Sequence, residues 1–169
     1  MKKLLTVLIL LMGLHVGAYA QSKSFQPFKL DAGIGLDFVS NGSASFIVTV
    51  EPHYRFADVF ALGLRFQQAV NLSATKNSVG FDSYASQCLS GDYYVTDTKE
   101  KLMVFIGGGA GVFSEQINNS DTEIAHFGYF PRVGLETGRF RASLEYNVTG
   151  GSKNYFAINA GLFFWGKRK

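Results

Sequence analysis

Residues 28–39 read FKLDAGIGLDFV, and this stretch decides the fold. Apolar side chains alternate along it with polar or small ones. Leu30, Ile34 and Leu36 therefore share one face, and Lys29 lies on the other. A repeat of two residues is the period of a β-strand, whose successive side chains point to opposite faces. Fold and function both depend on which of the two faces meets water.

The same period recurs along the chain, with no helical stretch between the repeats. It predicts eight strands, at residues 28–39, 46–56, 59–69, 83–96, 101–113, 127–135, 139–149 and 155–165. Turn-like connections at 57–58, 97–100 and 136–138 alternate with connections at 40–45, 71–82, 114–126 and 150–154. Tight turns at one end and longer polar segments at the other are typical of an up-and-down membrane barrel.

The N-terminal segment predicts export. Residues 1–20 have the layout of a cleavable secretory signal, in which Lys2 and Lys3 precede an apolar run and small residues. The predicted mature domain spans residues 21–169, and its formal charge falls from +3 to about +1, too small for a nucleic-acid footprint. No later stretch approaches the ~20 apolar residues of a spanning helix. Cys88 is the single cysteine, so no internal disulfide is expected.

Glycine and charged residues share the polar face, which indicates that this face is the interior. Charged residues make up only 17% of the chain, whereas glycine occurs 19 times. The interior of an eight-stranded barrel is just wide enough to be filled by side chains, so long charged residues need glycines across from them. The apolar face then forms a lipid-facing band with aromatic girdles. The predicted fold is an all-β, eight-stranded antiparallel up-and-down transmembrane β-barrel.

The charged residues of the polar face are candidates for a network inside the lumen. Unpaired charge away from water is costly, and pairing is the usual solution. We therefore expect the network to plug the lumen rather than line a channel. Its predicted members are Glu51, His53, Arg55, Arg65, Arg132, Arg141 and Glu145.

No residue pattern predicts catalysis, a metal site or a cofactor. His53 and His126 lack a partner arrangement with an oxyanion site, and neither is followed by Ser two positions later, as in outer-membrane lipid A deacylases. These histidines and Cys88 also lack metal-ligand spacing. The glycine run at 107–111 lies inside a predicted strand rather than before a helix, which favours close backbone packing over phosphate binding.

Three segments resemble the small, porin-like outer-membrane β-barrel domain family of Bacteroidota-type bacteria. They are DYYVTDTKEKLMVFIGGGAGVF (92–113), FPRVGLETGRFRASLEYNVTG (130–150) and NYFAINAGLFFWGKRK (154–169). The resemblance rests on the order of a Gly-rich strand, a Pro-Arg-x-Gly segment and a Glu-Tyr-Asn strand. It implies an integral barrel in the outer membrane of a Gram-negative cell and supplies no catalytic residues. The basic tail at 166–169 departs from barrels that end in an aromatic residue.

The expected function is a structural or surface-interaction role in the outer membrane, without enzymatic activity. The expected partners are outer-membrane lipid and an extracellular partner bound through residues 71–82 and 114–126, with the chain as a monomer and no nucleic acid. A soluble periplasmic lipocalin-like binder is one alternative and would enclose an apolar ligand with its apolar face. A small pore or a lipid-modifying outer-membrane enzyme is another.

Overall fold

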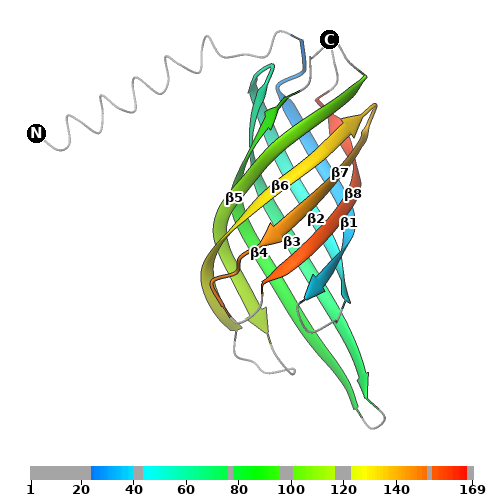
Figure 1. Ribbon diagram of the computed structural model, residues 1–169, viewed down its shortest axis with the longest axis vertical. Coiled ribbons are helices and arrows are strands. Elements are labelled where there is room, and N and C mark those ends of the chain that lie inside the picture. Colours follow the sequence, from blue (N-terminus) through cyan, green and yellow to red (C-terminus); the bar gives the residue numbers. More distant parts are fainter. Residues whose placement is uncertain are drawn as a thin grey trace, which may run out of the picture.

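Eight antiparallel strands close into a barrel in the computed structural model (Figure 1). Each strand pairs with the next along the chain, and β1 pairs with β8, so closure leaves no open edge in the barrel wall. The strands are β1 (Phe28–Val39), β2 (Ala44–Ala57), β3 (Phe60–Thr75), β4 (Ser78–Tyr94), β5 (Leu102–Gln116), β6 (Glu123–Thr137), β7 (Phe140–Asn147) and β8 (Tyr155–Trp165).

The structure describes residues 24–39, 44–75, 78–95, 101–116, 123–151 and 154–166. Within these ranges no helix is long and apolar enough to cross a membrane. The predicted signal at 1–20, the predicted turn at 97–100 and the end of the basic tail lie outside the described residues.

The first and last strands of the chain have the predicted bounds. β1 occupies residues 28–39 and β8 occupies residues 155–165, and together they form the closing seam of the barrel. The predicted two-residue turn at 57–58 is displaced by one residue, because β2 continues to Ala57 and the turn consists of Asp58 and Val59. A shift of this kind changes where the strand ends and leaves the described side chains of β2 on their predicted faces.

The predicted turn at 136–138 is also displaced. Glu136 and Thr137 belong to β6, and the turn consists of Gly138 and Arg139. Gly138 has φ 61°, a left-handed conformation that glycine adopts without a steric penalty. The backbone freedom of this glycine allows two strands to meet through only two residues.

A projecting ribbon replaces the predicted connection at 71–82, and that prediction is wrong. The pairing of β3 with β2 ends at Val70, but β3 and β4 remain paired as far as Thr75 and Ser78. Figure 1 shows this hairpin extending past the other strands at the end away from the termini. A ribbon outside the wall has no lipid to face, so its sequence need not alternate apolar and polar residues.

The predicted connection at 114–126 is likewise too long. β5 continues to Gln116 and β6 begins at Glu123, with the two strands paired at those residues. The tall β5–β6 pair adds to the ribbon at the same rim of the barrel. Longer structures at one rim and the two-residue turns at 58–59 and 138–139 at the other agree with the predicted up-and-down arrangement.

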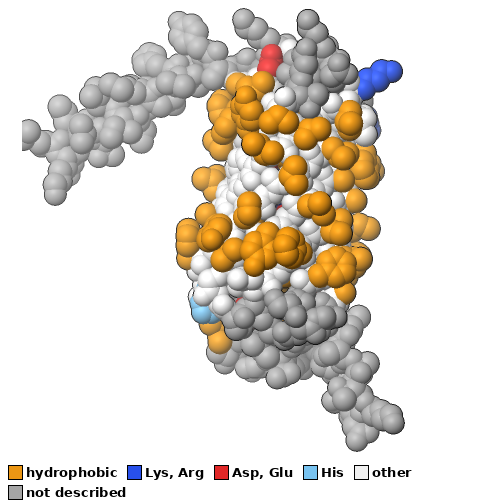
Figure 2. Space-filling model, viewed as in Figure 1, with side chains coloured by type: hydrophobic (Ala, Val, Ile, Leu, Met, Phe, Trp, Pro, Cys, Tyr) orange, Lys and Arg blue, Asp and Glu red, His pale blue; other side chains and the backbone are white. Residues whose placement is uncertain are grey.

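Apolar side chains cover the outer wall of the barrel (Figure 2). Ile34, Leu64 and Leu144 are each more than half exposed, although all three lie well inside their strands. Near the termini, the rings of Phe28 and Trp165 lie 5.9 Å apart and belong to an exposed aromatic rim. An apolar wall of this kind suits hydrocarbon rather than water. It excludes the lipocalin-like alternative, which requires these side chains inside.

Inward-facing glycines make room for charged groups, as predicted, and also for aromatic rings. Gly107 lies opposite Asp92 on one neighbouring strand and opposite Arg132 on the other. A Cβ at Gly109 would lie 2.7 Å from the ring of Phe130, and one at Gly128 would lie 2.6 Å from the ring of Phe113. Both phenylalanines are buried in the lumen. The charged residues therefore share the interior with rings that pack against glycine backbone.

Replacing Ile34 with Arg tests the assignment of the outer face. Ile34 lies near the middle of β1 and is 56% exposed. We expect Ile34→Arg to lower the free energy of unfolding from lipid vesicles by about 2–4 kcal/mol, because the charge enters the hydrocarbon. Val59→Arg, at the turn, is the control and should cost about 0–1 kcal/mol. A urea titration, in which the folded fraction is read from the gel mobility of unboiled samples, measures the free energy of unfolding of both variants. Equal losses in the two variants would contradict the assignment of the outer face.

Candidate functional site: a charged network in the lumen

Ten ionisable side chains meet inside the barrel, most of them on the strand halves nearer the termini. All of them are buried, with at most 8% of each residue exposed. We call this group the lumen network. It consists of the carboxylates of Asp31, Glu51, Asp92, Glu136 and Glu145 and the basic groups of Lys29, His53, Arg65, Arg132 and Arg141.

Arg132 is the centre of the network. It projects from β6, and its Nη1 and Nη2 each donate to a different carboxylate oxygen of Glu51 on β2, both at 2.8 Å. Its Nε and Nη2 also donate to the two oxygens of Asp92 on β4, at 2.8 and 3.0 Å. Strands β2 and β6 are not neighbours in the sheet, so this guanidinium bridges the lumen. Bidentate pairs of this type combine strength with fixed orientation.

A second group of contacts lies closer to the termini and centres on Glu136. Its Oε1 accepts hydrogen bonds from Lys29 Nζ at 2.5 Å, from the Tyr94 hydroxyl at 2.9 Å and from Arg141. Arg141 also donates to Asp92 at 2.7 Å, which connects this group to Arg132. One carboxylate thus receives donors from β1, β4 and β7.

Arg65 forms the part of the network farthest from the termini. Its guanidinium donates to Glu145 at 2.6 Å and to Asn147 at 2.9 Å, across the lumen from β3 to β7. The same group lies 3.4 Å from the centre of the Phe130 ring, a cation–π contact. Arg65 is completely buried, so these partners replace its hydration.

Arg55 lies in the half of the lumen nearer the termini but not in the ion-paired network. Its guanidinium lies 3.7 Å from the centre of the Tyr94 ring and 4.2 Å from that of Phe25. Among the described residues, no carboxylate forms an ion pair with it. Ser24 donates from its backbone and hydroxyl to Asp58, both at 3.0 Å, and this holds the segment carrying Phe25 against the terminal rim.

The structure brings together six of the seven predicted residues and adds four others. Asp92 is in a strand with weak alternation, and the sequence predicts a turn at Glu136, so neither pattern indicates a lumen residue. Lys29 and Asp31 are on the polar face of the clearest strand. Their roles depend on register, because Asp31 lies opposite Glu51 and Lys29 opposite His53.

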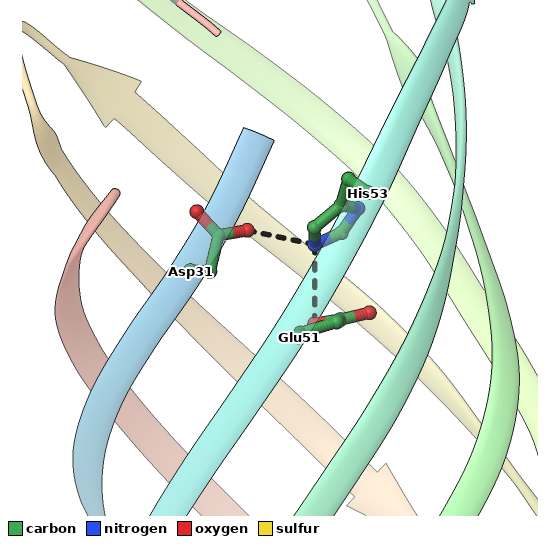
Figure 3. A group of neighbouring side chains, drawn as sticks. All are labelled: Asp31, Glu51 and His53. Carbon is green, nitrogen blue, oxygen red and sulfur yellow. Dashed lines mark ion pairs between the residues drawn. The ribbon is translucent and has the colours of Figure 1, made fainter. Parts of the chain in front are cut away.

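Asp31, Glu51 and His53 form the one group in the described residues whose ligand atoms are close enough to suggest a metal ion (Figure 3). His53 Nε2 lies 2.7 Å from Asp31 and 3.4 Å from Glu51. Ligands around one tetrahedral Zn²⁺ ion stand ~3.3 Å apart, whereas 2.7 Å suits direct contact between ring and carboxylate. Arg132 already occupies both oxygens of Glu51. The arrangement favours an ion pair over a metal centre.

His53 lies among carboxylates from three strands. Its Nε2 faces Asp31 on β1 and Glu51 on β2. Its Nδ1 also faces Asp92 at 3.8 Å, so the ring contacts carboxylates on two sides.

Comparison with solved structures identifies the class of fold. The crystal structure of Neisserial surface protein A (NspA) matches with a TM-score of 0.70 and 16% identity, over 85% of this chain and 99% of that chain. The N-terminal β-barrel domain of Pseudomonas aeruginosa OprF matches with a TM-score of 0.54 and 15% identity, over 83% of this chain and 99% of that chain. With a closed wall and an apolar exterior, this likeness defines an outer-membrane β-barrel.

No protein-family model and no curated protein matches the sequence. The resemblance of residues 92–113, 130–150 and 154–169 to one family of Bacteroidota-type bacteria therefore stays a prediction. The eight-stranded outer-membrane architecture does not depend on that family, because it follows from strand pairing and the exterior surface.

Removing the central guanidinium tests whether the network stabilises the barrel. We expect Arg132→Met to lower the free energy of unfolding by about 3–5 kcal/mol, because Glu51 and Asp92 keep their buried charges without their main partner. Arg139→Met, at the exposed turn, is the control and should change it by no more than about 0.5 kcal/mol. Urea titration in vesicles measures both variants. An Arg132→Met barrel as stable as its control would show that the network contributes nothing to stability.

Proposed function

We propose that the protein is a surface-interaction and structural barrel of the outer membrane whose lumen is plugged by the lumen network. The main observation that supports the plug is that Arg132 joins β2, β4 and β6 across the interior through four hydrogen bonds. Arg65 and Glu145 add a second crossing from β3 to β7. Side chains held from opposite walls support the plug, because they lie across the route that hydrated ions would take.

We also propose how the chain is exported and that it is a monomer in the membrane. Residues 1–20 act as the secretory signal, and residues 21–169 form the barrel domain. The barrel is a monomer, since its wall is closed by its own β1 and β8 and needs no second chain to pair its edges.

Electrical recording tests the plug. We expect purified protein in a planar bilayer to show no steady single-channel current, because the network fills the cross-section of the lumen. Arg132→Met is the informative comparison, since it removes the central crossing and should allow brief openings. A large, steady conductance from the unaltered protein would refute the plug and favour the small-pore alternative.

The surface role is supported by the backbone of the ribbon. Residues 71–75 of β3 and 78–82 of β4 pair with each other, while the pairings with β2 and β5 stop at Val70 and Ser83. Both outer edges of the ribbon therefore leave backbone groups unpaired within the described sheet. Such edges accept an extended peptide as an added strand. The segment 114–126, at the same rim, would form the neighbouring part of the contact surface.

Shortening the ribbon tests the surface role. We expect replacement of residues 72–81 by Asn-Gly to leave the barrel folded, so that the unboiled protein still migrates faster than the boiled protein on a gel (the heat-modifiable gel shift). The same replacement should abolish binding of extracellular partners to intact cells. The Asn-Gly pair suits a two-residue hairpin between Asn71 and Asp82, which are opposite each other. A barrel with Asn-Gly at 76–77 alone is the control, because it keeps both edges. Unchanged binding after shortening would assign the contacts elsewhere.

A further inference from the structure

A small cavity lies inside the barrel beside the β1–β8 seam. It has a volume of about 30 Å³, and Asp31, Asn159 and Ser143 are among the residues that line it. The cavity exists because Gly33 lies directly opposite Gly161, so neither strand sends a side chain inward at that level. The opposite wall is the lumen network, with Arg132 and its partners.

Two buried side chains at this cavity have polar atoms without protein hydrogen bonds. The amide nitrogen and the amide oxygen of Asn159 both lack a hydrogen-bond partner in the protein. Both carboxylate oxygens of Asp31 lack one as well. Each residue is only 8% exposed. Asp31 lies 3.4 Å from Lys29 Nζ and 2.7 Å from His53 Nε2, but neither contact has the geometry of a hydrogen bond. Buried polar atoms in native proteins rarely stay without hydrogen bonds.

The lining selects a small neutral molecule that both donates and accepts hydrogen bonds. An added cation would face the guanidinium groups of Arg132 and Arg141, and an added anion would face Asp31 and the other carboxylates. Asn159 itself requires both a donor and an acceptor. Water meets these requirements, and ~10–15 Å³ of such space is needed for one molecule.

We propose that the cavity is a built hydration site, in which about two water molecules hydrogen-bond the Asn159 amide and the Asp31 carboxylate. The waters complete the lumen network on the β1–β8 side, where Gly33 and Gly161 supply no side chain. This inference rests on the proposed plug, because it treats the waters as enclosed rather than as part of an aqueous channel. They supply to Asp31 the hydrogen bonds that its charged neighbours do not.

Water contacts detected by nuclear magnetic resonance test the site in the full-length folded protein in detergent micelles. We expect cross-peaks between water and the Asn159 side-chain amide. The control is the side-chain amide of Gln67, which is 5% exposed and bonds to Thr49 through its nitrogen and to Tyr155 through its oxygen. It should show no water cross-peak.

The three outcomes separate the hydration site from the plug. Cross-peaks at Asn159 alone support both. Cross-peaks at neither amide overturn the hydration site and leave the plug standing. Cross-peaks at both amides indicate an aqueous lumen, which overturns the enclosed site together with the plug.

Two substitutions test the hydration site in addition to the spectrum of the unaltered protein. Gly33→Ala adds a methyl group to the cavity with its nearest contact 3.1 Å away, at the Ala160 carbonyl oxygen, and should weaken the Asn159 water cross-peak in a barrel that still folds. Asn159→Leu should lower the temperature midpoint of the heat-modifiable gel shift, because bound water loses its amide partner. A raised midpoint would mean that the amide sits unpaired in a dry cavity, and the proposal would fail.

Discussion

Hydrocarbon around the wall is the constraint on which the rest of this structure depends. A lipid-facing wall cannot hold charge cheaply and cannot leave backbone groups unpaired. The first condition sends the charged side chains of the strands inward, and the second closes the sheet through the β1–β8 pairing. Eight strands enclose a space that side chains can fill, so the charges must satisfy one another there.

Much of the architecture was predictable from sequence because lipid exposure produces a strict two-residue period. β1 and β8 have the predicted bounds, and the faces of Lys29, Asp31 and Asn159 are as the alternation indicates. The ribbon was not predictable in this way, because residues 71–82 lie beyond the paired wall. Without a lipid face, those strands carry no periodic signal and resemble a polar loop.

The candidate site was predictable in part for a different reason. A strand's own pattern shows which residues face inward, and this selected Glu51, Arg132 and Glu145. It does not show which inward residues meet across the lumen, since that depends on register and on the tilt of strands far apart in the chain. Asp92 and Arg132, 40 positions apart in sequence, are an example. The packing of Phe130 against Gly109 also depends on register, because neither residue alone indicates the contact.

The lengthwise position of the network has a consequence for how such a barrel enters a membrane. By position along their strands, the members of the lumen network other than Glu145 lie in the half nearer the termini, whereas the buried Asp37 and Glu115 lie near the far ends of β1 and β5. A chain that inserts from the side of its termini moves its far rim through the bilayer first. The strand segments that travel farthest therefore carry few lumen charges. Most of the ionic groups stay near the entry side and can remain hydrated until closure brings their partners together.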